Sequence, residues 1–104
     1  SLKVIPGIPK DLSDKVVELL FSLPGAPQVI VFGSRAKGNF REGSDIDIAL
    51  KGGSVSQEDR SRILLKYDDL FLPWKLDLVV YDLIEEPALR EHIDHVGVAI
   101  DALN

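Results

Sequence analysis

Residues 29–50 read VIVFGSRAKGNFREGSDIDIAL and decide the fold of this chain. Apolar runs at 29–32 and 46–50 predict two strands, separated by a Gly-Ser step, a basic cluster and a polar loop. The second strand carries Asp45 and Asp47. Because residues two apart in a strand point to the same face, we expect the two carboxylates to lie side by side. Such a pair suits Mg²⁺, which prefers carboxylate oxygens and completes its shell with substrate phosphates.

The Gly-Ser step that follows the first strand fits a phosphate group. Glycine lets the backbone approach a ligand closely, and the amides that open the predicted short helix at 34–37 face an anion. The Ser34 hydroxyl adds a hydrogen bond, and three basic side chains add positive charge. We therefore predict that nucleotide phosphates bind to Gly33, Ser34, Arg35, Lys37 and Arg41. The alternatives are a plain helix cap for the serine and a solvated loop for the cations.

The spacing of these residues resembles a known signature. Gly33-Ser34, ten intervening residues and Asp45-Ile46-Asp47 reproduce the GS-x10-DxD pattern of the DNA polymerase β-like nucleotidyltransferase superfamily. The fuller string GSRAKG…SDIDIAL resembles its smallest branch, the minimal nucleotidyltransferase (MNT) domains. In that superfamily a later strand supplies a third carboxylate, and LDLVV provides Asp77. The segments LPWKLDLV and ALREHIDHVGVAI also resemble this branch, so the resemblance covers nearly the whole chain.

The resemblance implies a polymerase-β-like palm of the α/β (α+β) class, a small mixed sheet with helices packed against it. It implies that Asp45, Asp47 and Asp77 converge as catalytic residues and hold Mg²⁺, with two ions and ATP as the substrate. The first two would hold the metal that grips the triphosphate. The third would complete a second metal site or help to deprotonate the attacking hydroxyl.

The resemblance also implies a partner protein. MNT domains pair with small helical HEPN proteins in toxin–antitoxin systems, where the MNT protein is the antitoxin and can adenylylate the toxin. No acceptor site is evident in 104 residues, so we expect the acceptor on another chain. Two alternatives stay open: a binding module that neutralises a toxin by complex formation alone, and a transferase for a small molecule such as an aminoglycoside. A homo-oligomer is a further option.

The composition limits the remaining classes. A chain of 104 residues is expected to form one domain over 1–104, with an irregular, proline-containing arm at 1–9. The net charge of −5 disfavours non-specific nucleic-acid binding, and the lack of cysteine excludes disulfides and thiolate metal sites. No apolar run approaches the ~20 residues of a membrane span, and no signal peptide is visible, so a cytoplasmic location is expected.

The remaining pattern predicts helices alternating with strands. Helices are expected at 9–22, from a capping box at Ser56 to about 70, and from Pro87 to 96; strands are expected at 28–32, 45–51, 75–81 and 98–100. Strand 28–32 carries an unbroken apolar run after Gln28, which predicts burial on both faces. Within the second long helix the predicted core positions are Ile63, Tyr67, Leu70 and Phe71.

Three other side chains are interpreted conservatively. His92 and His95 lie three residues apart on a predicted helix, but two histidines without a third ligand are more often surface residues than a metal site. Trp74 is expected to anchor a loop in the core, and a contact with a partner is the minority interpretation.

Overall fold

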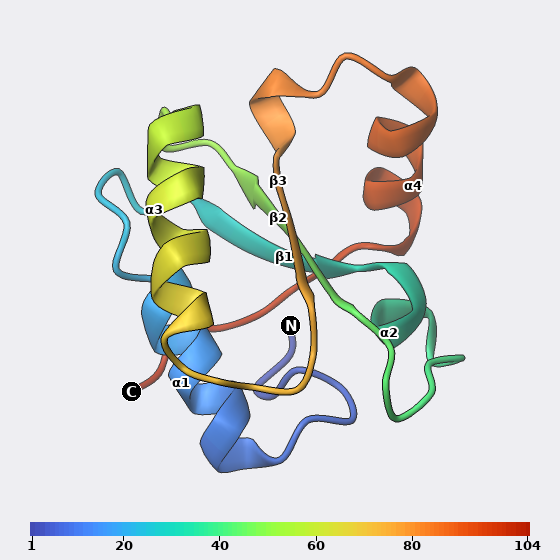
Figure 1. Cartoon of the computed structure of the whole chain (residues 1–104). Coiled ribbons are helices and arrows are strands. Elements are labelled where there is room, and N and C mark those ends of the chain that lie inside the picture. Colours follow the sequence, from blue (N-terminus) through green and yellow to red (C-terminus); the bar gives the residue numbers. More distant parts are fainter.

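The computed structural model describes residues 1–104 and is built around a four-stranded sheet (Figure 1). In chain order the elements are α1 (Lys10–Leu20), β1 (Gln28–Phe32), α2 (Gly33–Lys37), β2 (Ile46–Lys51), α3 (Gln57–Asp68), β3 (Leu76–Val80), the 3-10 helix η1 (Tyr81–Leu83), α4 (Pro87–Val96) and β4 (Val98–Ala99). The strand order is β3-β2-β1-β4. Strands β2 and β3 are parallel, and β1 is antiparallel to both β2 and β4. The mixed sheet predicted from the sequence is therefore confirmed.

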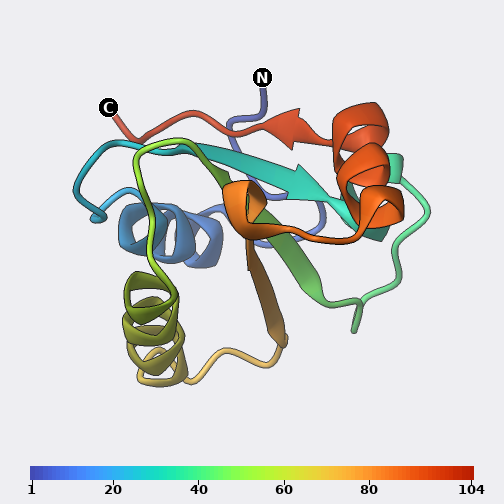
Figure 2. The same cartoon turned by 90° about the horizontal axis from the view of Figure 1, so that it is seen from above.

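The larger core lies between the sheet and helices α1 and α3, which both lie on one side of the strands (Figures 1 and 2). Alternate residues of β2 and β3 point into it, because neighbouring side chains of a strand face opposite ways. Fully buried Ile48 and Leu78 are examples, and Val16 of α1 and Ile63 of α3 meet them from the helices. This packing fixes which face of each strand remains for polar side chains.

A smaller core lies on the opposite face of the sheet, beneath α4. It consists of Ile30, Phe32, Ala49 and Ile93. Strand β1 contributes to both cores, so its buried, unbroken apolar run is explained as predicted. Helix α4 covers only part of this face, and the acidic residues of β2 and β3 share the face with it.

The N-terminal arm is irregular, as expected, but it is an integral part of the core. Ile5 and Ile8 are buried in the larger cluster. The backbone N–H of Ile5 donates to the buried Oγ of Ser13 at 2.9 Å, and Leu2 pairs with Ile100 beside β4. The arm therefore packs against α1 and the C-terminal segment.

The predicted end of α3 was wrong in its last turn. The capping box of Ser56 and Asp59 is present, with both reciprocal hydrogen bonds. The helix ends at Asp68, however, and Phe71 adopts a left-handed conformation with a φ of 52°. Its side chain is 89% exposed. The helix ends three residues before Phe71, so the helical spacing that would direct this side chain to the core does not reach it. None of the helices has the length and apolar character needed to cross a membrane.

Candidate active site

The register of the sheet brings two acidic residues next to each other. Asp47 of β2 lies opposite Asp77 of the parallel strand β3, and on its other side opposite Phe32, the last residue of β1. The flanking residues of both strands enter the larger core, so both acids point to the face that α4 covers only in part. Asp47 is half-buried and Asp77 is exposed. Asp45 precedes β2, which begins one residue later than predicted.

The electrostatics of this group are those of crowded, uncompensated acids. Burial, together with the neighbouring carboxylates of Asp77 and Asp45, raises the pKa of Asp47 from 3.8 to about 6. The guanidinium of Arg35 opposes this only weakly. None of the three ion pairs in the structure includes these acids. A bound cation would relieve the repulsion, which is the physical reason to regard the cluster as functional.

Gly33 is fitted directly to one of these acids. Its φ is +68°, a left-handed conformation that side chains disfavour. A Cβ built at this position would lie 2.1 Å from Oδ2 of Asp47. The sequence predicted that this glycine lets a ligand approach; the structure shows that it first makes room for the Asp47 carboxylate. Ser34 lies in the first turn of α2 and is half-buried. It does not cap this helix, because the N-cap position is held by Phe32.

The fit of a metal ion to this site is partial. The carboxylates offer the oxygen ligands that Mg²⁺ prefers. No group of three or more His, Asp or Glu side chains is close enough to hold an ion by itself. Asp47 and Asp77 face each other across the strands, and Asp45 lies near enough to raise the pKa of Asp47. These three side chains would hold a cation only with water or phosphate oxygens as its further ligands.

The predicted basic residues lie in two different environments. Lys37, the last residue of α2, and Arg41, in the loop that follows, are both exposed. Arg35 is only 1% exposed. Its guanidinium donates to four backbone carbonyls, those of Pro6, Glu42, Ser44 and Asp45. It therefore holds the chain in place, and Lys37 and Arg41 are the basic side chains that remain for a phosphate.

The other side chains noted in the sequence are His92, His95 and Trp74. His92 of α4 is half-buried with its ring edge-on to Phe32, at a centroid distance of 5.9 Å, and His95 is exposed. Trp74 anchors its loop as expected: it packs against the larger core, and its indole N–H donates to the carbonyl of Glu42 at 2.9 Å. This contact was not predictable from the sequence, because it joins loops 32 residues apart.

A family model described as "Polymerase beta, Nucleotidyltransferase" matches residues 14–101, which include every candidate site residue. The chain belongs to this family. No curated protein sequence matches this nucleotidyltransferase.

Solved structures share the fold of this nucleotidyltransferase. A putative minimal nucleotidyltransferase is 29% identical, with a TM-score of 0.61, over 85% of this chain and 89% of that one. A toxin–antitoxin crystallised with AMP-PNP is 22% identical, with a TM-score of 0.70, over 88% of this chain and 73% of that one. A mutant of the MntA–HpeT toxin–antitoxin is 20% identical, with a TM-score of 0.69 and the same coverage. The two toxin–antitoxin structures establish likeness of fold.

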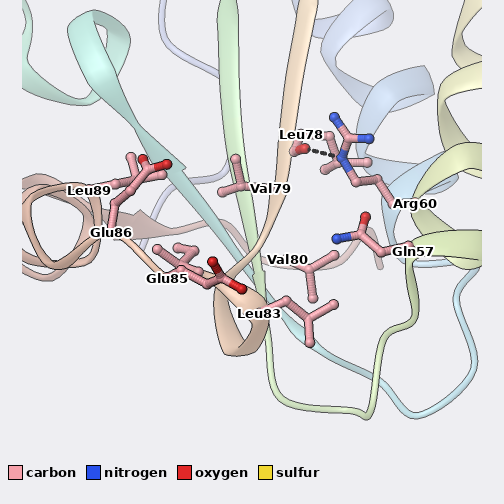
Figure 3. Close-up of a pocket in the computed structure, with 10 residues that line it drawn as sticks. Gln57, Arg60, Leu78, Val79, Val80, Leu83, Glu85, Glu86 and Leu89 are labelled. Carbon is pink, nitrogen blue, oxygen red and sulfur yellow. Dashed lines mark hydrogen bonds between the residues drawn. The ribbon is translucent and has the colours of Figure 1, made fainter.

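A pocket in this nucleotidyltransferase lies away from the carboxylates, over the C-terminal end of β3 (Figure 3). It is an open hollow of about 350 Å³ between the start of α3, the segment after β3 and the start of α4. Its lining combines apolar side chains, such as Val79 and Leu89, with the charged side chains of Arg60, Glu85 and Glu86 (Figure 3). Two carboxylates against one guanidinium leave the lining with a net negative charge, which disfavours a triphosphate here and leaves α2 as the candidate phosphate site.

Proposed function

We propose that this nucleotidyltransferase transfers a nucleoside monophosphate, AMP from ATP, to a hydroxyl group of a partner protein in an Mg²⁺-dependent reaction. The observation that carries the proposal is the packing of the Gly33 turn against the Asp47 carboxylate, beside Asp77 on the next strand. Burial and the unpaired acids beside it raise the pKa of Asp47, and a bound cation would offset this repulsion. The adjoining helix start suits the phosphates that accompany the cation.

The backbone amides of Gly33 and Ser34 are the proposed contacts for the phosphates of ATP. The first amides of a helix have no partner within the helix, so they are free to bind an anion. Lys37 and Arg41, exposed nearby, would neutralise the charge of the leaving pyrophosphate. Holding the triphosphate in one orientation supplies much of the catalysis of such a transfer.

Asp45, Asp47 and Asp77 would hold Mg²⁺, which supplies charge neutralisation at the reacting phosphate when it is bound. The acceptor oxygen forms a bond to the α-phosphorus while the bond to the pyrophosphate oxygen breaks. The hydroxyl proton passes to Asp77 or to solvent. Asp77 is the exposed member of the facing pair, so it is the carboxylate that an acceptor arriving from solution would meet.

The proposed acceptor is a toxin of the helical HEPN type, with this chain as its antitoxin. Structures of the same fold include a toxin–antitoxin with AMP-PNP and the MntA–HpeT toxin–antitoxin, which supports a pairing of this kind. The acidic net charge of −5 agrees with a protein acceptor better than with bulk nucleic acid.

The test is to incubate the chain with labelled ATP, Mg²⁺ and the protein encoded by the adjacent gene. Intact mass spectrometry then measures AMP on that protein, and a growth assay scores neutralisation of its toxicity. The matched variant is Asp77→Asn, which removes one carboxylate of the facing pair and adds no bulk.

We expect AMP addition and neutralisation to be lost together in the variant. Neutralisation without AMP addition would mean that the chain acts as a binding module. Transfer of AMP to an aminoglycoside but not to the protein would favour the small-molecule reaction. No transfer by wild type to either acceptor would contradict the proposal.

A further inference from the structure

Arg35 is a buried cation with an unusual set of partners. Its Nε donates to the carbonyl of Asp45 at 3.2 Å, its Nη1 to that of Pro6 at 2.8 Å, and its Nη2 to that of Ser44 at 2.7 Å. A longer contact of 3.4 Å joins Nη2 to the carbonyl of Glu42. None of these partners is a carboxylate, and no ion pair compensates the charge.

Burial of a charged side chain is costly unless hydrogen bonds compensate it. The hydrogen bonds that compensate the buried charge of Arg35 come mainly from the loop that precedes β2, since three of its four acceptors lie at 42–45. Arginine presents five donors in a rigid planar fork, so one side chain can fix several carbonyls at once. The loop that it fixes carries Asp45 and leads directly into Asp47.

The same loop is braced from the side of β3. The indole N–H of Trp74 donates to the carbonyl of Glu42, and the N–H of Ile46 donates to the carbonyl of Lys75. Residues 74 and 75 immediately precede the strand that carries Asp77. The loops that enter the two acid-bearing strands are therefore tied together.

The N-terminal arm completes the enclosure of Arg35. The Phe40 ring lies 5.2 Å from the guanidinium carbon, a cation–π distance. Gly7 has a φ of +80°, and a Cβ there would lie 2.8 Å from Nη1 of Arg35 and 2.3 Å from the Phe40 ring. A side chain at position 7 would collide with Arg35 and Phe40. The glycine therefore lets the arm pack directly against the guanidinium.

We propose that Arg35 is a positioning residue: by fixing the backbone at 42–45 it sets how Asp45 and Asp47 present their carboxylates to a divalent cation. Trp74 assists by aligning this loop with the start of β3. The inference rests on the proposed function for its consequence, metal-dependent nucleotide binding. An apolar side chain of similar length would leave the carbonyls of this loop without donors. The buried guanidinium is therefore explained by the loop that presents the carboxylates.

The first test compares Arg35→Lys with Arg62→Lys. Both changes keep the charge and remove the guanidinium fork, but Arg62 is exposed and bonds only to Asp59. Calorimetry measures the affinity for a non-hydrolysable ATP analogue, once with Mg²⁺ and once with EDTA. We expect Arg35→Lys to weaken the Mg²⁺-dependent affinity at least about tenfold, as for the loss of outer contacts at metal sites, and to leave the metal-free affinity unchanged.

The second test measures backbone hydrogen exchange, which reports the order of the loop without ligand. In Arg35→Lys we expect faster exchange at 42–47 and unchanged exchange in α3 and β1. Trp74→Phe removes one donor to Glu42 and keeps an apolar ring, so it provides a milder variant if Arg35→Lys does not fold. It should give a smaller effect of the same kind at 42–47.

The outcomes separate the inference from the proposed function. If wild type binds the analogue with Mg²⁺ and Arg35→Lys binds it equally well, the positioning role is wrong and the proposed function stands. If both affinities fall together, with and without metal, the role of Arg35 is general stability rather than positioning. If wild type shows no Mg²⁺-dependent binding, the proposed function fails; unchanged exchange at 42–47 would then overturn the inference as well.

Discussion

Replacement of Asp47 by asparagine is expected to stabilise the metal-free protein near neutral pH. Burial and the carboxylates of Asp77 and Asp45 raise the pKa of Asp47 from 3.8 to about 6. The folded chain therefore binds this proton more tightly than the unfolded chain does. Since the folded state holds more protons, the free energy of unfolding of wild type falls as the pH rises from about 4 to about 6.

The size of the effect follows from the shift. A rise from 3.8 to about 6 corresponds to at most about 3 kcal/mol, at about 1.4 kcal/mol for each pKa unit. Asp47 keeps contact with solvent, which screens its repulsion from the other acids, so about 1 kcal/mol is a realistic gain. Asparagine has nearly the same shape and carries no charge, so the packing against Gly33 should be retained.

The assay is urea denaturation in EDTA at about pH 7.5 and about pH 4, where the two protonation states of Asp47 dominate in the folded chain. Glu91→Gln, on the exposed face of α4, serves as the control for removal of one negative charge. We expect Asp47→Asn to exceed wild type by about 1 kcal/mol at the higher pH and the difference to close at the lower pH. A variant less stable than wild type at the higher pH, or a gain independent of pH, would refute the reasoning.

Three further predictions follow from the contacts. Gly33→Ala places a Cβ 2.1 Å from Oδ2 of Asp47, so it should displace that carboxylate, reduce stability by about 1–2 kcal/mol and abolish Mg²⁺-dependent nucleotide binding by calorimetry; normal binding would contradict it. Asp77→Asn should lower nucleotidyl transfer, measured by mass spectrometry, by orders of magnitude while the nucleotide still binds, and equal loss of both would count against its catalytic role. Phe71→Asn should change the free energy of unfolding by less than about 0.5 kcal/mol, whereas Ile63→Ala should cost about 2–4 kcal/mol; a large loss at position 71 in urea denaturation would mean that its exposed side chain contributes to packing.

The elements of the fold were predictable because their signals are local. The capping box at Ser56, the proline at the start of α4 and the alternation in β3 each act within one helix or strand, and the structure confirms all three. The expected proximity of Asp47 and Asp77 also followed from a local pattern together with the family resemblance. The end of α3 was missed because helix length depends on tertiary packing, and Phe71 shows the result.

The environment of Arg35 was not predictable from the sequence. In the string GSRAKG it is one of several basic residues, and nothing local distinguishes it from Lys37. Its burial depends on an arm 29 residues away and a loop that folds back over it. The contact of Gly33 with Asp47 depends on strand register in the same way. Long-range contacts of this kind decide which residues of a motif meet a ligand and which hold the others in place.

The proposed metal-nucleotide site is tested most directly by a calorimetric titration with a non-hydrolysable ATP analogue, with and without Mg²⁺. The titration compares wild type with the double variant Asp45→Asn, Asp47→Asn. Circular dichroism checks that the variant remains folded. We expect wild type to bind the analogue more tightly when Mg²⁺ is present, and we expect this enhancement to be absent in the folded double variant. The same Mg²⁺-dependent affinity in both proteins would contradict the assignment of these carboxylates as the metal-nucleotide site.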